Sequence, residues 1–164
     1  HEVIKLLKEG NDFGVLSDAG CPGIADPGAE IAGLAHENNI KVIPLVGPSS
    51  FFMALMASGL NGQHFSFSGY LPKDKSDRAG KIKKMISLVE KQNASQIFMD
   101  TPFRNLQVLE TILEITPKDI QLCIATNVNS SDEFIETKPI HVWKKTATPN
   151  IQKKPCVFIL GKLA

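Results

Sequence analysis

The first sixty residues alternate between helical and strand-like spacing of apolar side chains. Helical spacing ends at Gly10, resumes after the Asp26-Pro27 pair, and returns in a segment rich in Phe, Met and Leu that stops near Gly59. Between these segments, residues 12–17 and 41–46 are short apolar runs that predict buried strands. A strand–helix–strand–helix order of this kind favours a parallel α/β sheet.

The pattern changes after Gly62, where we place a boundary between two lobes. Residues 1–62 are expected to be the remainder of an N-terminal α/β lobe with a parallel sheet, and residues 63–164 a C-terminal lobe with a mixed α/β sheet. Apolar spacing and the cap at Thr101 predict the elements of the second lobe, which are helices at 79–91 and 102–115 and strands near Phe65 and Phe67 and at 96–100, 120–125, 134–137 and 156–160.

Composition narrows the class of protein without identifying it. The 164 residues are 43% hydrophobic and carry a formal charge of +1, so the chain can form a core and has no overall basic field for nucleic acid. Three scattered cysteines favour reduced thiols and a cytoplasmic location. The four histidines lie far apart in the sequence and lack the spacing of metal ligands, so no metal site is expected. The apolar stretch 42–60 is interrupted by Pro44, Gly47 and Pro48, so no membrane association is expected.

The chain opens at His1 inside a predicted helix, so we expect the natural N-terminus to lie upstream.

Three polar loops follow predicted strands, at residues 17–28, 47–50 and 100–104. Ligands of parallel α/β sheets bind at such loops, beyond the carboxyl ends of the strands, although ordinary tight turns have the same composition. The first loop has neither a Walker A motif nor G-x-G-x-x-G, which weakens a nucleotide triphosphate or dinucleotide interpretation. Asp18 beside it would repel polyphosphate and tolerate a cationic sulfonium.

These loops also carry a family resemblance. Ser-Asp-Ala-Gly-Cys-Pro with Asp-Pro-Gly, Pro-Leu-Val-Gly-Pro-Ser-Ser, and Phe-x-Phe-x-Gly-Tyr-Leu-Pro follow one another in the first half of the chain. Ile-Phe-Met-Asp-Thr-Pro-Phe-Arg and Pro-Cys-Val-Phe-Ile-Leu-Gly continue the match in the second half. The chain thereby resembles the tetrapyrrole methylase superfamily, in its branch of ribosomal RNA small-subunit methyltransferase I and relatives.

The resemblance implies a two-lobed, usually homodimeric methyltransferase that binds S-adenosylmethionine between its lobes and methylates a ribose 2′-hydroxyl of small-subunit ribosomal RNA. The resemblance also implies that the substrate is ribosomal RNA or the small ribosomal subunit. Carried over position by position, the implied cofactor-binding residues are Ala19, Gly20, Cys21, Pro22, Ile24, Ser49, Ser50, Met99, Asp100, Ala125, Pro155 and Cys156.

No catalytic residue is assigned from the sequence. Asp18 and Asp100 are candidates for accepting a proton from a ribose hydroxyl, but an Asx-type turn and a helix-start charge are the more common roles of such residues. Arg104 suits an RNA phosphate or a surface ion pair with a neighbouring acid. Phe103 and Trp143 suit base stacking or the core.

Lysine and arginine gather in two segments, 73–84 and 144–154, where an RNA groove competes with an ordinary solvated face.

Two other functions remain open at this point. A tetrapyrrole C-methyltransferase acting on a corrin or sirohaem precursor shares the resemblance to the superfamily, although its branch usually carries Gly-Asp-Pro where this chain has the Asp-Ala-Gly-Cys-Pro turn. A non-catalytic module that binds S-adenosylmethionine is the second alternative.

Overall fold

The computed structural model describes residues 2–18 and 20–163 of the chain. Contacts within the chain divide it into two compact units, His1–Ser49 and Ser50–Ala164. The helix α3 (Ser50–Ser58) lies in the second unit, where it contacts the sheet, whereas the sequence analysis grouped it with the first lobe. The lobe boundary near Gly62 stays a prediction.

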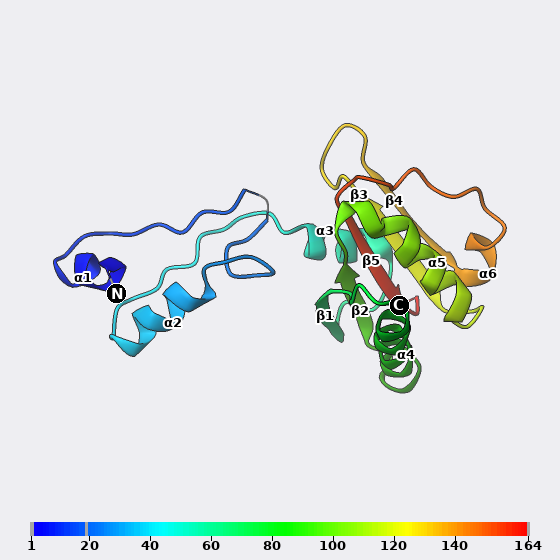
Figure 1. Ribbon diagram of the computed structural model, residues 1–164, viewed down its shortest axis with the longest axis horizontal. Coiled ribbons are helices and arrows are strands. Elements are labelled where there is room, and N and C mark those ends of the chain that lie inside the picture. Colours follow the sequence, from blue (N-terminus) through cyan, green and yellow to red (C-terminus); the bar gives the residue numbers. More distant parts are fainter. Residues whose placement is uncertain (1, 19, 164) are drawn as a thin grey trace. The chain divides into compact units, whose positions relative to one another are not determined.

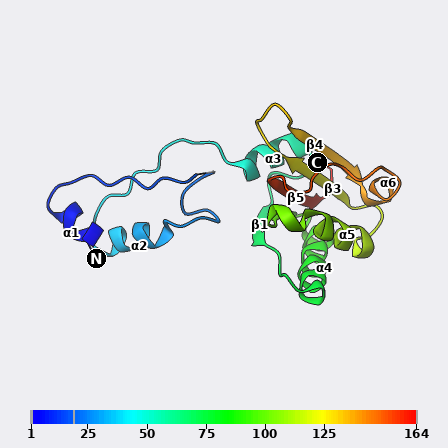
Figure 2. The ribbon, with the colours of Figure 1, turned by 45° about the horizontal axis from the view of Figure 1, so that its top comes forward.

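The second unit is built on a five-stranded mixed sheet with the order β1-β2-β5-β3-β4 (Figures 1 and 2). Only the β1–β2 pair is parallel; β5 runs antiparallel to both of its neighbours, and β3 runs antiparallel to β4. The strands are β1 (Phe65–Tyr70), β2 (Ser95–Met99), β3 (Gln121–Thr126), β4 (Phe134–Pro139) and β5 (Cys156–Gly161). The predicted mixed α/β class is thus confirmed.

Alternate residues of the central strands enter two different cores. On β5, Phe158 and Leu160 face one core and Val157 and Ile159 face the other, as the two-residue period of a strand requires. The first core is shared with α4 (Lys75–Gln92), α5 (Asn105–Ile115) and α6 (Ile140–Trp143). The second core is covered by α3, so the sheet lies between helices on both faces.

Local signals explain where the long helix α4 begins and ends. The Asp74 side chain accepts hydrogen bonds from the backbone N–H groups of Ser76 (2.7 Å) and Asp77 (3.0 Å), which satisfies donors that the helix leaves unpaired. Asn93 ends the helix in the left-handed conformation with φ 50°. The observed helix therefore starts four residues before the predicted segment 79–91, because the cap lies at Asp74.

The remaining predictions for the second unit agree closely with the structure. The strands differ from their predicted ranges by one or two residues at an end. The segment predicted as one helix from Pro102 consists of the 3-10 turn η1 (Pro102–Arg104) followed by α5. Thr101 occupies the cap position of η1, but its side chain makes no capping bond to the backbone. The short helix α6 was not predicted.

The first unit contains the helices α1 (Glu2–Lys8) and α2 (Ala29–Glu37). The structure assigns no strand to residues 12–17 or 41–46, so the parallel sheet predicted for the first lobe is not formed by the described residues up to Ser49. Leu16 is 92% exposed and Leu45 88% exposed. A strand needs a hydrogen-bonded neighbour, and these two runs do not pair with each other or with other described residues.

No helix among the described residues is both long enough and apolar enough to cross a lipid bilayer.

Phe158 tests the first core. Its ring is fully buried and stacks on Phe98 with centroids 5.7 Å apart, so Phe158→Ala removes a large apolar side chain from a closed environment. We expect the free energy of unfolding to fall by about 3–5 kcal/mol, measured by urea denaturation. Phe103→Ala is the matched control, because Phe103 is 68% exposed and its loss should change stability by less than about 0.5 kcal/mol. Equal effects of the two substitutions would contradict this core.

Candidate functional site

One edge of the sheet gathers five of the six candidate residues of the second unit; the sixth, Ser50, begins α3. β5 begins where β2 and β3 end, and Val157 is paired with Met99 on one side and with Ala125 on the other. Cys156 is the first residue of β5 and is paired with Thr126. Pro155 and Asp100 extend two of these strands by one residue, so all five candidates lie at the same edge.

The candidates at this edge differ in exposure. Ala125 and Cys156 are buried and face opposite cores, while Pro155 is exposed and Met99 is half-buried. Burial raises the pKa of the Cys156 thiol, with a smaller contribution from the nearby Cys123, and burial also raises the pKa of Cys123. Both thiols are therefore held in the protonated form, which argues against a nucleophilic role for either.

Asp100 and Arg104 form a buried ion pair beside these strand ends. The Asp100 side chain is fully buried and that of Arg104 is 17% exposed. Oδ1 of Asp100 contacts the Arg104 guanidinium and also accepts a hydrogen bond from the backbone N–H of Thr101 at 2.6 Å. The guanidinium in turn donates through Nε to the Thr101 hydroxyl at 3.3 Å. This arrangement gives Asp100 the structural role at a helix start, and it buries an ion pair that the sequence analysis placed on the surface.

The same edge holds several buried polar atoms without a hydrogen-bond partner. Among the described residues these atoms include Oδ2 of Asp100, Nη1 of Arg104, Oδ1 of Asn105 and Oγ1 of Thr126. Each of these atoms can still make a hydrogen bond, and buried polar atoms in native proteins are nearly always paired. The set offers acceptors, a hydroxyl and a cationic donor.

In the first unit, the structure brings two of the candidate loops together. The Cys21 thiol donates a hydrogen bond to the backbone carbonyl of Pro48 at 3.3 Å, which joins the loop 17–28 to the loop 47–50. The first loop is also closed on itself, because the Gly23 N–H donates to the Pro27 carbonyl (3.1 Å) and the Ile24 N–H donates to the Cys21 carbonyl (3.2 Å). Cys21 is thus a loop-joining residue.

Gly20 has the geometry of a backbone that a ligand can approach. Its φ is 82°, which lies in the left-handed region where side chains are disfavoured, and a Cβ added there would meet no atom within 4 Å. Pro22 and Ile24 are exposed, Ser49 is buried, and Ser50 begins α3. Ala19 lies outside the described residues.

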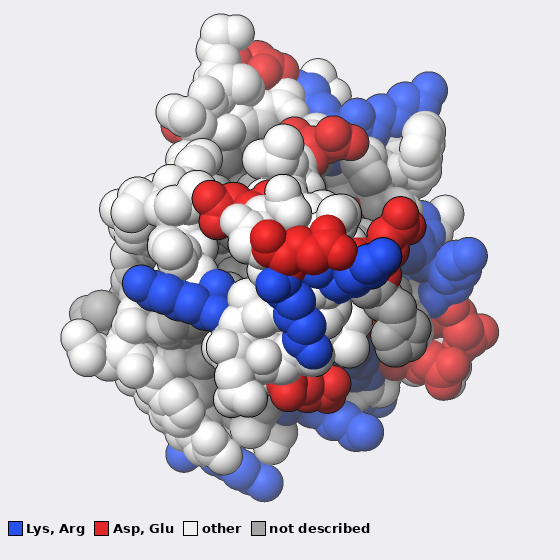
Figure 3. All heavy atoms as spheres, turned by 90° about the vertical axis from the view of Figure 1, so that its left-hand side faces the viewer, with Lys and Arg blue, Asp and Glu red and all other residues white. Residues whose placement is uncertain are grey.

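Three basic side chains of the segments 73–84 and 144–154 are engaged by partners within the protein. Arg78 is buried, and its guanidinium donates to the Thr111 hydroxyl and to the Lys73 carbonyl. Lys81 donates to the Ser68 carbonyl at 2.6 Å, and Lys154 pairs with Asp132 at 3.4 Å. Figure 3 is viewed from the side on which Figure 1 draws the first unit, and on that face lysine and arginine are interspersed with aspartate and glutamate.

The two aromatic candidates separate. Trp143 is 3% exposed and its indole N–H donates to the Leu122 carbonyl at 2.8 Å, so it belongs to the core. Phe103 is 68% exposed and lies beside the ion pair, in the turn η1.

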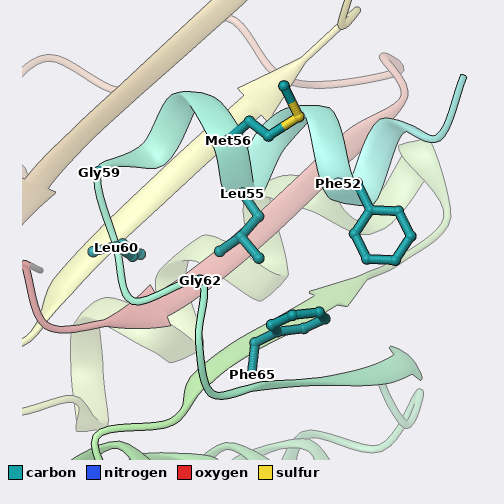
Figure 4. Close-up of a pocket in the computed structure, with 7 residues that line it drawn as sticks. All are labelled: Phe52, Leu55, Met56, Gly59, Leu60, Gly62 and Phe65. Carbon is teal, nitrogen blue, oxygen red and sulfur yellow. The ribbon is translucent and has the colours of Figure 1, made fainter.

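An apolar pocket of about 500 Å³ lies elsewhere, between α3 and the start of β1 (Figure 4). None of the predicted site residues lines it; the lining residues are Phe52, Leu55, Met56, Gly59, Leu60, Gly62 and Phe65. Within residues 2–18 and 20–163, no group of three or more His, Cys, Asp or Glu side chains is placed to hold a metal ion.

Comparison with known proteins finds similar proteins among those that are curated. No family model matches the chain. Curated relatives do: the chain is 32% identical over 161 residues to ribosomal RNA small subunit methyltransferase I of Buchnera aphidicola, and 36% identical over 162 residues to the protein of that name from Bacillus subtilis. These matches cover 96% and 98% of the chain. The chain is thus similar to ribosomal RNA small subunit methyltransferase I over nearly its whole length.

The chain spans about half the length of these curated relatives, 55% of the Buchnera protein and 54% of the Bacillus protein. Two solved structures have a similar fold. The methyltransferase CobJ matches 99% of the chain with a TM-score of 0.64 at 18% identity, and the match covers 70% of CobJ. Diphthine synthase matches 87% of the chain with a TM-score of 0.60 at 17% identity, covering 57% of that protein.

Sequence reasoning missed Asn105, which is fully buried at the first position of α5. A polar residue that directly follows the Pro-Phe-Arg turn and precedes the apolar face of a helix was the available signal.

The Asp100–Arg104 pair predicts a large coupling energy. Asp100→Asn and Arg104→Met each leave one buried charge without its partner, so each should lower the free energy of unfolding by about 3–5 kcal/mol. The double variant should lose markedly less than the sum of the two. Urea denaturation of the four proteins measures the coupling. The exposed Lys75–Glu114 pair is the control and should give a coupling of about 1 kcal/mol or less; additive losses at Asp100 and Arg104 would contradict a buried pair.

Cysteine alkylation tests the burial at this edge. Cys21 is partly exposed, whereas Cys123 and Cys156 are buried and their pKa values are raised. Because the thiolate is the reactive species, iodoacetamide should modify Cys21 in the folded chain and should reach the other two only after unfolding. Mass spectrometry of the digested protein gives the rate at each site. Alkylation of Cys156 in the folded chain at the rate of Cys21 would show that this strand end is open.

Proposed function

We propose that this protein is an S-adenosylmethionine-dependent methyltransferase that methylates a ribose 2′-hydroxyl of small-subunit ribosomal RNA. The observation that carries the proposal is the match, over nearly the whole chain, to curated relatives named ribosomal RNA small subunit methyltransferase I. Its substrate is the RNA or the assembled small ribosomal subunit. We further propose that it works in the cytoplasm as a homodimer.

The residues present fit such a cofactor. Gly20 offers an open backbone with positive φ, and the Cys21–Pro48 hydrogen bond holds the first candidate loop against the second. The sheet edge of the second unit adds Met99, Asp100 and the start of β5. We propose that the cofactor binds in a cleft between the lobes and is held by the first-lobe residues Ala19, Gly20, Cys21, Pro22, Ile24, Ser49 and Ser50 together with Met99, Asp100, Ala125, Pro155 and Cys156.

The chemistry asks little of individual side chains. S-adenosylmethionine supplies an electrophilic methyl group on a sulfonium. The task of the protein is to orient the ribose hydroxyl in line with that group and to exclude water, which accounts for a large part of the acceleration in reactions of this kind. Asp100 is engaged by Arg104 through Oδ1, so its free Oδ2 is suited to accepting a hydrogen bond.

Methyl transfer tests the proposal directly. The protein is incubated with methyl-labelled S-adenosylmethionine and, in parallel, with small ribosomal subunits, naked small-subunit RNA or uroporphyrinogen. We expect label in the RNA, at a position that resists alkaline cleavage because the 2′-oxygen is blocked. Label in uroporphyrinogen alone would replace the RNA proposal with a tetrapyrrole methyltransferase. Cofactor binding by calorimetry without transfer to any substrate would indicate a non-catalytic module.

Gly20→Val provides the site variant for the same assay. The substitution places a β-branched side chain at φ 82° in the candidate loop, so we expect cofactor affinity to fall by about tenfold or more. Gly14→Val is the matched control, because an added Cβ there also meets no atom within 4 Å and Gly14 has no positive φ.

A further inference from the structure

We infer that Asn105 is a positioning residue that fixes the backbone entering β5, and through it the part of the cofactor site formed by Pro155 and Cys156. The inference rests on the proposed function. It assigns to the site a residue that lies outside the family motifs quoted above and acts through hydrogen bonds to residues 151 and 154.

The Asn105 side chain donates both of its amide hydrogens to the loop 151–154. Nδ2 donates to the Ile151 carbonyl at 2.7 Å and to the Lys154 carbonyl at 2.8 Å. The side chain is fully buried, and its own Oδ1 has no partner. A buried acceptor left unpaired is costly, so the favourable contribution of this amide comes from the two hydrogen bonds that Nδ2 donates.

Two neighbouring contacts hold the same loop. The Gln152 side chain donates to the Phe103 carbonyl at 2.8 Å and accepts from the Leu106 N–H at 3.4 Å. The Lys153 N–H donates to the Pro102 carbonyl at 2.9 Å. The turn η1 and the first residues of α5 therefore make hydrogen bonds to each of the residues 151–154.

These hydrogen bonds matter because the backbone of the loop 151–154 is strained at one residue. Lys153 has φ 60°, a left-handed conformation that a residue with a Cβ adopts only when its surroundings impose it. Without the bonds from η1 and α5, the chain around Lys153 would relax toward commoner conformations. The path of the following residues into β5 would then change.

The far side of the loop is tied to the end of β3. The Asn127 N–H donates to the Pro155 carbonyl at 3.1 Å, and Lys154 pairs with Asp132 at 3.4 Å. Hydrogen bonds from Ser130 and Asn127 hold the pKa of Asp132 below its usual value, so the carboxylate is available to Lys154. Pro155 and Cys156 are thus fixed from both sides.

The test uses Asn105→Asp, which keeps the shape of the side chain and replaces the amide NH2, and with it both N–H donors, by one carboxylate oxygen that faces two carbonyls. We expect the dissociation constant for S-adenosylhomocysteine, measured by calorimetry, to rise about tenfold. In the transfer assay the KM for S-adenosylmethionine should rise, whereas kcat and the KM for RNA should change little. A generally destabilised enzyme would not show that selective pattern.

Gln152→Ala is the second variant, since Gln152 is only partly buried and its loss removes two bonds of the same loop without opening the core. It should raise the same KM in the same direction. Gln107→Ala, an exposed amide on α5, is the matched control and should bind as wild type does. Hydrogen exchange at residues 151–157 should be faster in both loop variants than in the control.

The outcomes separate the two proposals. Folded Asn105→Asp and Gln152→Ala proteins that bind S-adenosylhomocysteine with the wild-type constant would overturn the role of Asn105 while leaving the proposed function intact. If Asn105→Asp does not fold, Gln152→Ala alone decides. A wild-type protein that binds neither S-adenosylmethionine nor S-adenosylhomocysteine would overturn the proposed function itself, and the role of Asn105 with it.

Discussion

The arrangement of the second unit depends on one strand. β5 is the middle strand of the sheet and contributes every one of its residues to the interior, with successive side chains entering opposite cores. Its first residues also pair with the ends of both β2 and β3. The packing that stabilises the unit and the edge that gathers the candidate residues therefore rest on the same backbone hydrogen bonds. A shift of β5 by one residue would exchange its two faces and displace the candidate edge together with the cores.

Much of this unit could be predicted from sequence because its signals are local. The continuous apolar run 156–160 is typical of a strand buried on both faces, and β5 begins and ends within a residue of that range. The start of α4 was less well placed, since the decisive cap at Asp74 lies inside a charged segment that resembles an exposed connection. In the first unit the same reasoning gave strands at 12–17 and 41–46, which the structure does not pair. An apolar run identifies a segment suited to a sheet, but pairing depends on what lies beside it.

The candidate site, too, could be predicted from the sequence only in part. The three loops could be located from the sequence, because each is a short polar stretch that follows a predicted strand. The sequence did not reveal the hydrogen bonds from Asn105 to Ile151 and Lys154, since they join positions 46 and 49 residues apart and leave no local pattern. It also misplaced the environment of Arg104: the charge at i+4 from Asp100 is visible in the sequence, whereas the burial of the pair depends on the strands around it.

The burial of charge also bears on how RNA would be recognised under the proposed function. Arg78 and Arg104 are the only arginines in the sequence, and both spend their guanidinium groups on internal partners. Arginine is the side chain best suited to bidentate phosphate contacts, so this chain would have to meet RNA mainly with lysine, backbone groups and the exposed ring of Phe103. With a net charge of +1, counterion release from a broad basic surface would contribute little. Selectivity would then rest on the shape of the RNA and on a few local contacts.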